Sequence, residues 1–157
     1  MKRRFEKMHG LGNDFVIFDA REARLEMTQG RARALADRRT GIGCDQLIVL
    51  EPSERADVRM RIWNSDGSEV GACGNASRCV ALLLGGETRI ETGGGILAAS
   101  ANGAAATVDM GEPRFAWDEI PRAHMKMWKN QHKPGNMAVL VQAKRPGMRT
   151  IEEAREG

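Results

Sequence analysis

One cysteine, Cys73, lies in a sequence context that suits proton transfer or nucleophilic attack. It stands in the segment 71–79 (GACGNASRC), directly before a predicted helix. The first N–H groups of a helix have no acceptor within it, and with the helix dipole they favour a thiolate over a thiol. A thiolate can act as a nucleophile or, in a dry pocket, as a base. The sequence therefore predicts that the sulfur of Cys73 carries the chemistry.

The other two cysteines fit packing roles better. Cys79 begins the apolar run of the same helix and is predicted to be a core residue, and Cys44 precedes a short apolar strand and is predicted to pack in the core or near the pocket. No Cys-x-x-Cys spacing or clustered histidines accompany the cysteines, so we expect no metal site and reduced thiols rather than a disulfide framework. For Cys73 a structural role also stays open on local evidence alone, because free cysteine is most often a small hydrophobe.

Several amide side chains are candidates for binding a polar substrate. Asn13, Asn64 and Asn75 stand at predicted turns or at the helix start, and Gln46 stands at a strand entrance. Each can either satisfy the local backbone or bind a ligand, and the residues alone leave both readings open. The Gly-x-Gly at Gly10 is a weak dinucleotide signal, because the chain continues from there as a strand rather than a helix.

The elements that must position these residues form an α+β pattern over the first 118 residues. A helix is predicted over Thr28–Arg39, with Thr28 as its cap, Arg38 and Arg39 in its last turn and Gly41 as its stop. A second helix, 75–84, is so apolar that it must be covered on most sides. Period-two patterns and apolar runs bounded by turn residues predict the strands that cover it, over 5–8, 15–18, 47–50, 58–62, 88–92, 96–100 and 106–110.

Composition and charge describe an ordinary globular chain with a distinct tail. The 157 residues are 41% hydrophobic and 29% charged, with no apolar run long enough to span a membrane and no secretory signal. Residues 1–120 carry 16 Lys and Arg against 18 Asp and Glu, whereas 121–157 carry 8 against 3. Without a basic stripe interleaved with aromatics, we expect no nucleic-acid partner. We predict a domain over 1–118 and a divergent, partly disordered basic tail over 119–157.

Four blocks of this sequence together resemble the diaminopimelate epimerase family. They run in register over roughly residues 3–118, which makes the resemblance specific in a way that no single block would be. The blocks are 8–15 (MHGLGNDF), 37–46 (DRRTGIGCDQ), 64–69 (NSDGSE) and 73–75 (CGN). The resemblance implies a half-molecule in which a mixed or antiparallel β-sheet wraps a central helix, with the active site in a cleft between two such halves.

The resemblance also implies a reaction and a set of site residues. The family epimerises LL-diaminopimelate to meso-diaminopimelate, for lysine and cell-wall precursors, with one cysteine as base and a second as acid. It uses no pyridoxal phosphate, other cofactor or metal. By resemblance Cys73 is one catalytic cysteine, the protein is cytoplasmic, and its partner is a small amino-acid substrate, with a homodimer left open. The implied substrate-binding residues are Asn13, Gln46, Asn64, Gly74 and Asn75.

The departures from the family pattern define the alternatives. Ala76 and Ser77 stand where the family usually has Gly-Ala after Cys-Gly-Asn, and the second cysteine block of the family has no counterpart in this sequence. We therefore expect a truncated form lacking the second cysteine. The alternative is a non-catalytic remnant or partner-binding domain of the same fold. A proline-racemase-like or phenazine-biosynthesis-like isomerase is a weaker third reading.

Overall fold

The computed structural model describes residues 3–111 and residue 121. By its internal contacts the chain divides into a unit of Met1–Met110 and a unit of Gly111–Gly157, and all the elements below lie in the first. The boundary predicted at residue 118 falls outside the described residues, as does nearly all of the predicted tail. The division into a 1–118 domain and a 119–157 tail therefore stays a prediction.

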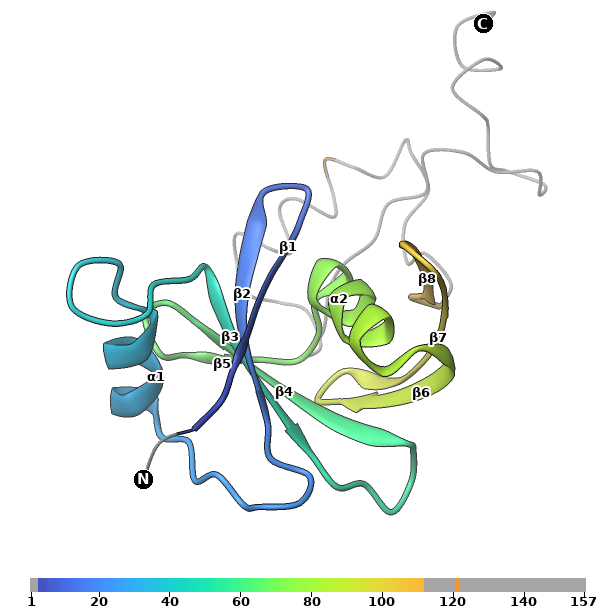
Figure 1. Ribbon diagram of the computed structural model, residues 1–157, viewed down its shortest axis with the longest axis horizontal. Helices are drawn as coiled ribbons and strands as arrows, with labels where there is room; N and C mark the ends of the chain where they lie inside the picture. The colour runs from blue at the N-terminus through green and yellow to red at the C-terminus, as the bar shows by residue number, and fades with distance from the viewer. Residues whose placement is uncertain (1–2, 112–120, 122–157) are drawn as a thin grey trace, which may run out of the picture. The chain divides into compact units, whose positions relative to one another are not determined.

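The described part of the chain consists of strands and two helices, arranged as Figure 1 shows. The helices are α1 (Gln29–Ala36) and α2 (Gly74–Leu84). The strands are β1 (Glu6–Gly10), β2 (Asn13–Asp19), β3 (Gln46–Glu51), β4 (Val58–Asn64), β5 (Glu69–Val70), β6 (Gly86–Thr92), β7 (Gly95–Asn102) and β8 (Ala105–Asp109). Each predicted strand is present, whereas the short β5 was not predicted because two residues leave no periodic pattern.

The strands of the described residues form one mixed sheet. Its order is β1-β2-β3-β4-β6-β7-β8, with β5 paired to β4. The β2–β3 and β4–β6 pairs are parallel, and the remaining pairs are antiparallel. Both edge strands, β1 and β8, contact α2, as do β6 and β7. The sheet therefore curves around α2 (Figure 1), which confirms the predicted α+β fold with a sheet wrapped round a central helix.

Alternation along the strands divides the buried residues into two cores. On one face, Phe15, Ile17 and Ile48 pack with Ile62 and with the apolar side of α2, including Val80. The opposite face of β2 and β3 packs with α1 and forms a second cluster. Because successive side chains of a strand point to opposite faces, this division fixes which residues of each strand face α2.

Helix α1 is shorter than its sequence pattern suggests. Thr28 caps it as predicted, because its Oγ accepts a hydrogen bond from Arg31 N–H at 3.3 Å. The helix ends at Ala36, so the prediction that Arg38 and its neighbour Arg39 form the last turn is wrong. The carboxylate of Asp37 accepts hydrogen bonds from the backbone N–H groups of Arg39 and of the next residue at 2.8 and 2.7 Å. This local turn competes with the helical hydrogen bonds and ends the helix.

The hairpin between β1 and β2 closes with a strained two-residue turn. Leu11 and Gly12 have φ angles of 54° and 88°, both in the left-handed region. Such turns match the twist of a hairpin, and they favour residues without a branched or bulky side chain. Leu11 is nevertheless 90% exposed at the tip, beside the end of the sheet that carries the polar residues described next.

Candidate functional site

Three predicted amide residues lie at one end of the sheet and on the face that packs against α2. Asn13 begins β2, Gln46 begins β3 and Asn64 ends β4. Each has the same strand parity as the residues whose side chains contact α2, such as Phe15 and Ile62. Since β2 and β3 are parallel and β4 is antiparallel to β3, all three amides meet at the same sheet end.

The N-terminus of α2 approaches this end with Cys73 at its cap position. Cys73 has extended backbone angles (φ −151°, ψ 114°), and its side chain makes no capping hydrogen bond. Its carbonyl accepts hydrogen bonds from Ser77 N–H and Ser77 Oγ, both at 2.9 Å. The helix therefore starts directly after Cys73, which confirms the predicted placement of the thiol beside the first-turn N–H groups, which have no acceptor within the helix.

Cys73, at the start of α2, lies next to Asn13, at the start of β2. The Cys73 thiol lies 3.9 Å from Asn13 Oδ1, within the range of a weak S–H hydrogen bond. Close by, β1 runs against the helix: a Cβ added to Gly10 would lie 3.1 Å from Asn75 Cβ. A glycine at this strand position lets the backbone of β1 approach Asn75 closely, so Gly10 lies against the start of the helix.

Gln46 and Asn64 are linked and leave one polar atom free. Gln46 Nε2 donates to Asn64 Oδ1 at 2.9 Å, and Asn64 Nδ2 donates to Ser68 Oγ at 3.1 Å. Gln46 Oε1 is buried and has no hydrogen-bond partner among the described residues. A buried acceptor without a partner costs free energy, so its presence here marks a position where a donor of a ligand fits.

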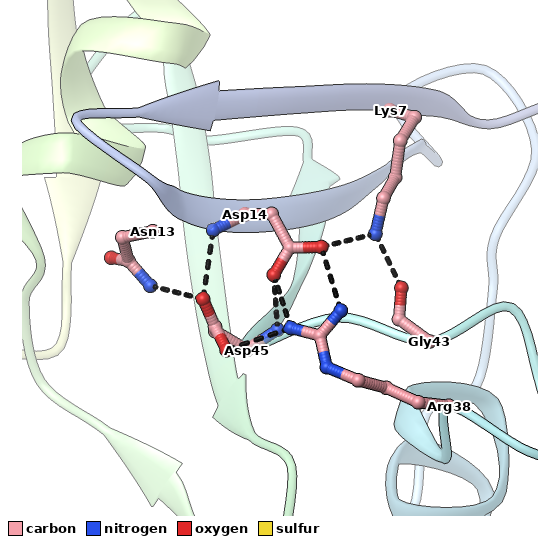
Figure 2. Close-up of polar contacts among 6 residues, drawn as sticks. All are labelled: Lys7, Asn13, Asp14, Arg38, Gly43 and Asp45. Atoms are coloured by element: carbon pink, nitrogen blue, oxygen red, sulfur yellow. Dashed lines mark hydrogen bonds and ion pairs between the residues drawn. The ribbon is translucent and has the colours of Figure 1, made fainter.

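A network of charged groups borders the amides on the side of Asn13 (Figure 2). Asp14 accepts hydrogen bonds from Arg38 Nη2 at 2.6 Å and Lys7 Nζ at 2.7 Å, and Arg38 Nη2 also donates to Asp45 Oδ1 at 2.8 Å. Lys7 Nζ further donates to the carbonyl of Gly43. The Arg38 guanidinium above all, with the Lys7 ammonium, holds the pKa of Asp14 well below its usual range. The network ties the loop after α1 to the first hairpin.

Two of the three cysteines are unsuited to chemistry. Cys44 and Cys79 are 1% and 2% exposed, which confirms their predicted core positions. Burial raises the pKa of both thiols. They therefore stay protonated and out of reach of solvent at neutral pH, whereas Cys73 is only partly buried.

The loop that carries Cys73 is held by a glycine turn whose role the sequence did not reveal. The Gly94 N–H donates to the Gly71 carbonyl at 2.8 Å, and a Cβ on Gly93 would lie 3.2 Å from the Gly71 Cα. The run of glycines at 93–95 predicted only a hairpin turn, although its close approach to the loop also requires small residues. Met110 was missed as well; its Sδ lies 3.6 Å from the position of a Cβ on Gly74.

Ala76, one of the two residues that depart from the pattern of the resembled family, is fully buried in the core around α2. Its methyl group therefore adds to the packing beneath the helix start. Ser77, the other departure, turns its hydroxyl back to the carbonyl of Cys73. Neither departure removes a polar group from the amide set at the sheet end.

A separate groove lies beside the site. It has a volume of about 330 Å³ between β1, α2 and the start of β8, and His9, Arg78 and Leu82 are among its lining residues. None of the predicted site residues lines it. Among the described residues, no group of three His, Cys, Asp or Glu side chains could hold a metal ion. Nor is either described helix long and apolar enough to cross a membrane.

Comparison with known proteins shows which family this sequence resembles. The family model described as diaminopimelate epimerase matches residues 5–116. A diaminopimelate epimerase of Rhizorhabdus wittichii is 65% identical over 125 residues, covering 79% of this chain and 46% of that protein. One of Sphingopyxis alaskensis is 63% identical over 123 residues, covering 78% and 46%. The chain thus spans about half the length of the curated relatives it matches.

Among solved structures, a hydroxyproline epimerase of Agrobacterium vitis with bound trans-4-hydroxy-L-proline has a TM-score of 0.47 to this chain. The two sequences are 16% identical, and the match covers 60% of this chain and 36% of the other.

Proposed function

The chain belongs to the diaminopimelate epimerase family, and from this premise we propose that its polar sheet end is one side of a diaminopimelate site. The proposed reaction converts the LL isomer to the meso isomer without a cofactor, with Cys73 as one catalytic residue. Asn13, Gln46, Asn64, Gly74 and Asn75 are the proposed substrate-binding residues. We further propose that the protein works in the cytoplasm, with a homodimer as a candidate assembly.

One observation carries the proposal: amide groups from three strands meet a partly buried thiol at a helix N-terminus. Gln46 Oε1 is buried and has no hydrogen-bond partner in the described part of the chain, so it can accept a hydrogen bond from an ammonium group of the substrate. The N–H groups at the start of α2, including that of Gly74, suit a carboxylate. A zwitterionic dicarboxylate with two amino groups offers both kinds of group at once.

The chemistry of Cys73 follows from its position. As a thiolate it removes the hydrogen of Cα as a proton, forming an S–H bond, and the electron pair of the broken C–H bond remains on the carbanion. The neighbouring carboxylate delocalises this charge, and the N–H groups of α2 stabilise it. A second acid then delivers a proton to Cα from the opposite face, which inverts the centre.

We propose that this second acid is a cysteine in the part of the family's length that this sequence does not cover. The remaining cysteines of this chain, Cys44 and Cys79, are buried in the two cores and do not reach the site. We therefore expect the chain alone to leave the two isomers unconverted. This burial also agrees with the second candidate function, a folded half that does not catalyse by itself.

Protection of Cys73 from alkylation tests the proposed site on the chain as it stands. The rate of iodoacetamide addition at Cys73 is followed by peptide mass spectrometry with and without LL-diaminopimelate, and lysine serves as the control that lacks the second carboxylate. We expect diaminopimelate to slow the reaction more than lysine does. Equal rates with and without diaminopimelate up to ~10 mM, above the usual range of KM values, would contradict the placement.

A further inference from the structure

Asp45 lies beside the proposed site but outside the residues assigned to it. Its Oδ2 accepts a hydrogen bond from Asn13 Nδ2 at 3.2 Å and another from Asp14 N–H at 3.0 Å. The other end of the same amide, Asn13 Oδ1, lies 3.9 Å from Cys73 Sγ. One side-chain amide is thus placed between a carboxylate and a sulfur (Figure 2 shows its contact with Asp45).

The orientation of this amide follows from what each neighbour can do. An ionised carboxylate only accepts hydrogen bonds, an amide nitrogen only donates, and an amide oxygen only accepts. Asp45 therefore selects the orientation in which Nδ2 of Asn13 turns toward it and Oδ1 turns toward Cys73. Without Asp45 the amide is free to reverse, and its N–H groups would then face the sulfur.

Asp45 is itself fixed by its other contacts. Arg38 Nη2 donates to Asp45 Oδ1 at 2.8 Å, so both carboxylate oxygens are engaged. The same nitrogen of Arg38 reaches Asp14 Oδ1 at 2.6 Å, and Lys7 Nζ reaches Asp14 Oδ2 at 2.7 Å. The two carboxylates therefore face two cations, and these contacts hold the Asp45 side chain in one position.

We propose that Asp45 is a positioning residue that holds the Asn13 amide with its oxygen, rather than its N–H groups, toward Cys73. This role of Asp45 adds to the proposed function and depends on it. An amide oxygen accepts from an S–H group and so stabilises the form that Cys73 reaches after it has taken the proton. An N–H group would instead stabilise the thiolate and make it a weaker base. Asp45 thus acts on the proton transfer through Asn13.

The test measures alkylation of Cys73 by iodoacetamide at one fixed pH near neutrality, in the full chain without substrate. Asp45→Ala releases the Asn13 amide to donate to the thiolate, so we expect Cys73 to react about fivefold faster, the factor that one such hydrogen bond supplies. In an Asn13→Ala background the same Asp45→Ala change is expected to have no effect. This double-mutant cycle isolates the part of the effect that passes through Asn13.

The cycle separates the proposal from simpler explanations. A direct effect of the Asp45 charge would persist in the Asn13→Ala background, and that result would overturn the proposal. Loosening of the fold is monitored in the same digest, because Cys44 and Cys79 are buried and gain alkylation only when the chain opens. If Asp45→Ala opens the chain, Asp45→Leu keeps much of the side-chain volume, removes both acceptor oxygens and is expected to raise the rate about fivefold. An unchanged rate in that variant would also overturn the proposal.

The result is independent of the proposed function. The alkylation cycle contains no diaminopimelate, so coupling between Asp45 and Asn13 can be found even if diaminopimelate fails to protect Cys73. Conversely, protection without coupling would support the function and remove Asp45 from the mechanism.

Discussion

Replacing Asp14 by Asn is expected to weaken the fold at the edge of the site. Asp14 is 19% exposed and accepts hydrogen bonds from Arg38 at 2.6 Å, from Lys7 at 2.7 Å and from Asp45 N–H at 3.0 Å. An asparagine of the same shape loses the charge, and its NH₂ group must face one of these donors. The variant therefore removes charge-assisted bonds without creating a cavity.

The expected loss follows from the number and exposure of these contacts. A hydrogen bond to a charged group contributes about 1.5–3 kcal/mol, but the Lys7 and Arg38 side chains are 41% and 57% exposed, so solvent screens them. We expect Asp14→Asn to lower the free energy of unfolding by ~2 kcal/mol at pH 7. The matched control is Asp19→Asn, whose ion pair with Arg21 is exposed on both sides and is expected to change stability by less than ~0.5 kcal/mol.

The difference between wild type and Asp14→Asn is also expected to depend on pH. The pKa of Asp14 is lowered in the folded state, chiefly by Arg38. The ionised carboxylate therefore makes its full contribution to the free energy of unfolding at pH values above the unfolded-state pKa of about 3.9. The contribution is lost as pH falls through the lower folded-state pKa. Measured by urea unfolding, the difference in free energy of unfolding between wild type and Asp14→Asn should stay constant from about pH 7 to 5. It should shrink below about pH 4. Equal losses in Asp14→Asn and Asp19→Asn at pH 7 would refute the reasoning.

Four further variants test the packing of the fold by urea unfolding. Gly41→Ala would place a Cβ 2.2 Å from the Ala34 carbonyl oxygen and is expected to lower the free energy of unfolding by ~3 kcal/mol. Gly30→Ala, in open space on α1, should raise it by about 0.5 kcal/mol. Equal effects of the two changes would contradict the loop geometry. Cys79→Ala removes a buried core thiol and should cost ~1 kcal/mol, and Cys73→Ala less than ~0.5 kcal/mol. The reverse order of these two losses would place the wrong thiol in the core.

Much of the fold follows from local pattern. The apolar helix α2 predicts its own covering, and the period-two strands around it supply that covering, because neither element is stable with its apolar side in water. The capping role of Thr28 and the position of Cys73 at a helix start are likewise local properties. The sequence around each is enough to predict them.

The polar contacts are less accessible to sequence reasoning. The end of α1 at Ala36 depends on the Asp37 carboxylate, which accepts hydrogen bonds from two backbone N–H groups and so competes with the helical hydrogen bonds. The contact of Asp45 with Asn13 joins the residue before β3 to the first residue of β2, and no periodicity encodes it. The closeness of Gly94 to Gly71 depends on how the sheet curves, which is a property of the whole fold.

The meeting of the three amides at one end of the sheet depends partly on local sequence pattern and partly on how the strands pair. Strand parity predicts that Asn13 shares a face with Phe15, once the strand is known. That Gln46 and Asn64 meet at the same sheet end depends on the parallel β2–β3 and antiparallel β3–β4 pairings. The family resemblance predicted these residues together, whereas their individual sequence contexts left structural roles open.

The most direct measurement of the central claim is deuterium uptake at Cα of diaminopimelate in heavy water, followed by NMR. The protein is this chain joined to the part of the Rhizorhabdus wittichii relative that the match does not cover; over the 125 matched residues the two sequences are 65% identical. The account predicts uptake and inversion in the joined protein, a loss of at least ~100-fold in Cys73→Ala, and near-normal uptake in Cys79→Ala. Equal uptake in Cys73→Ala and Cys79→Ala would contradict it.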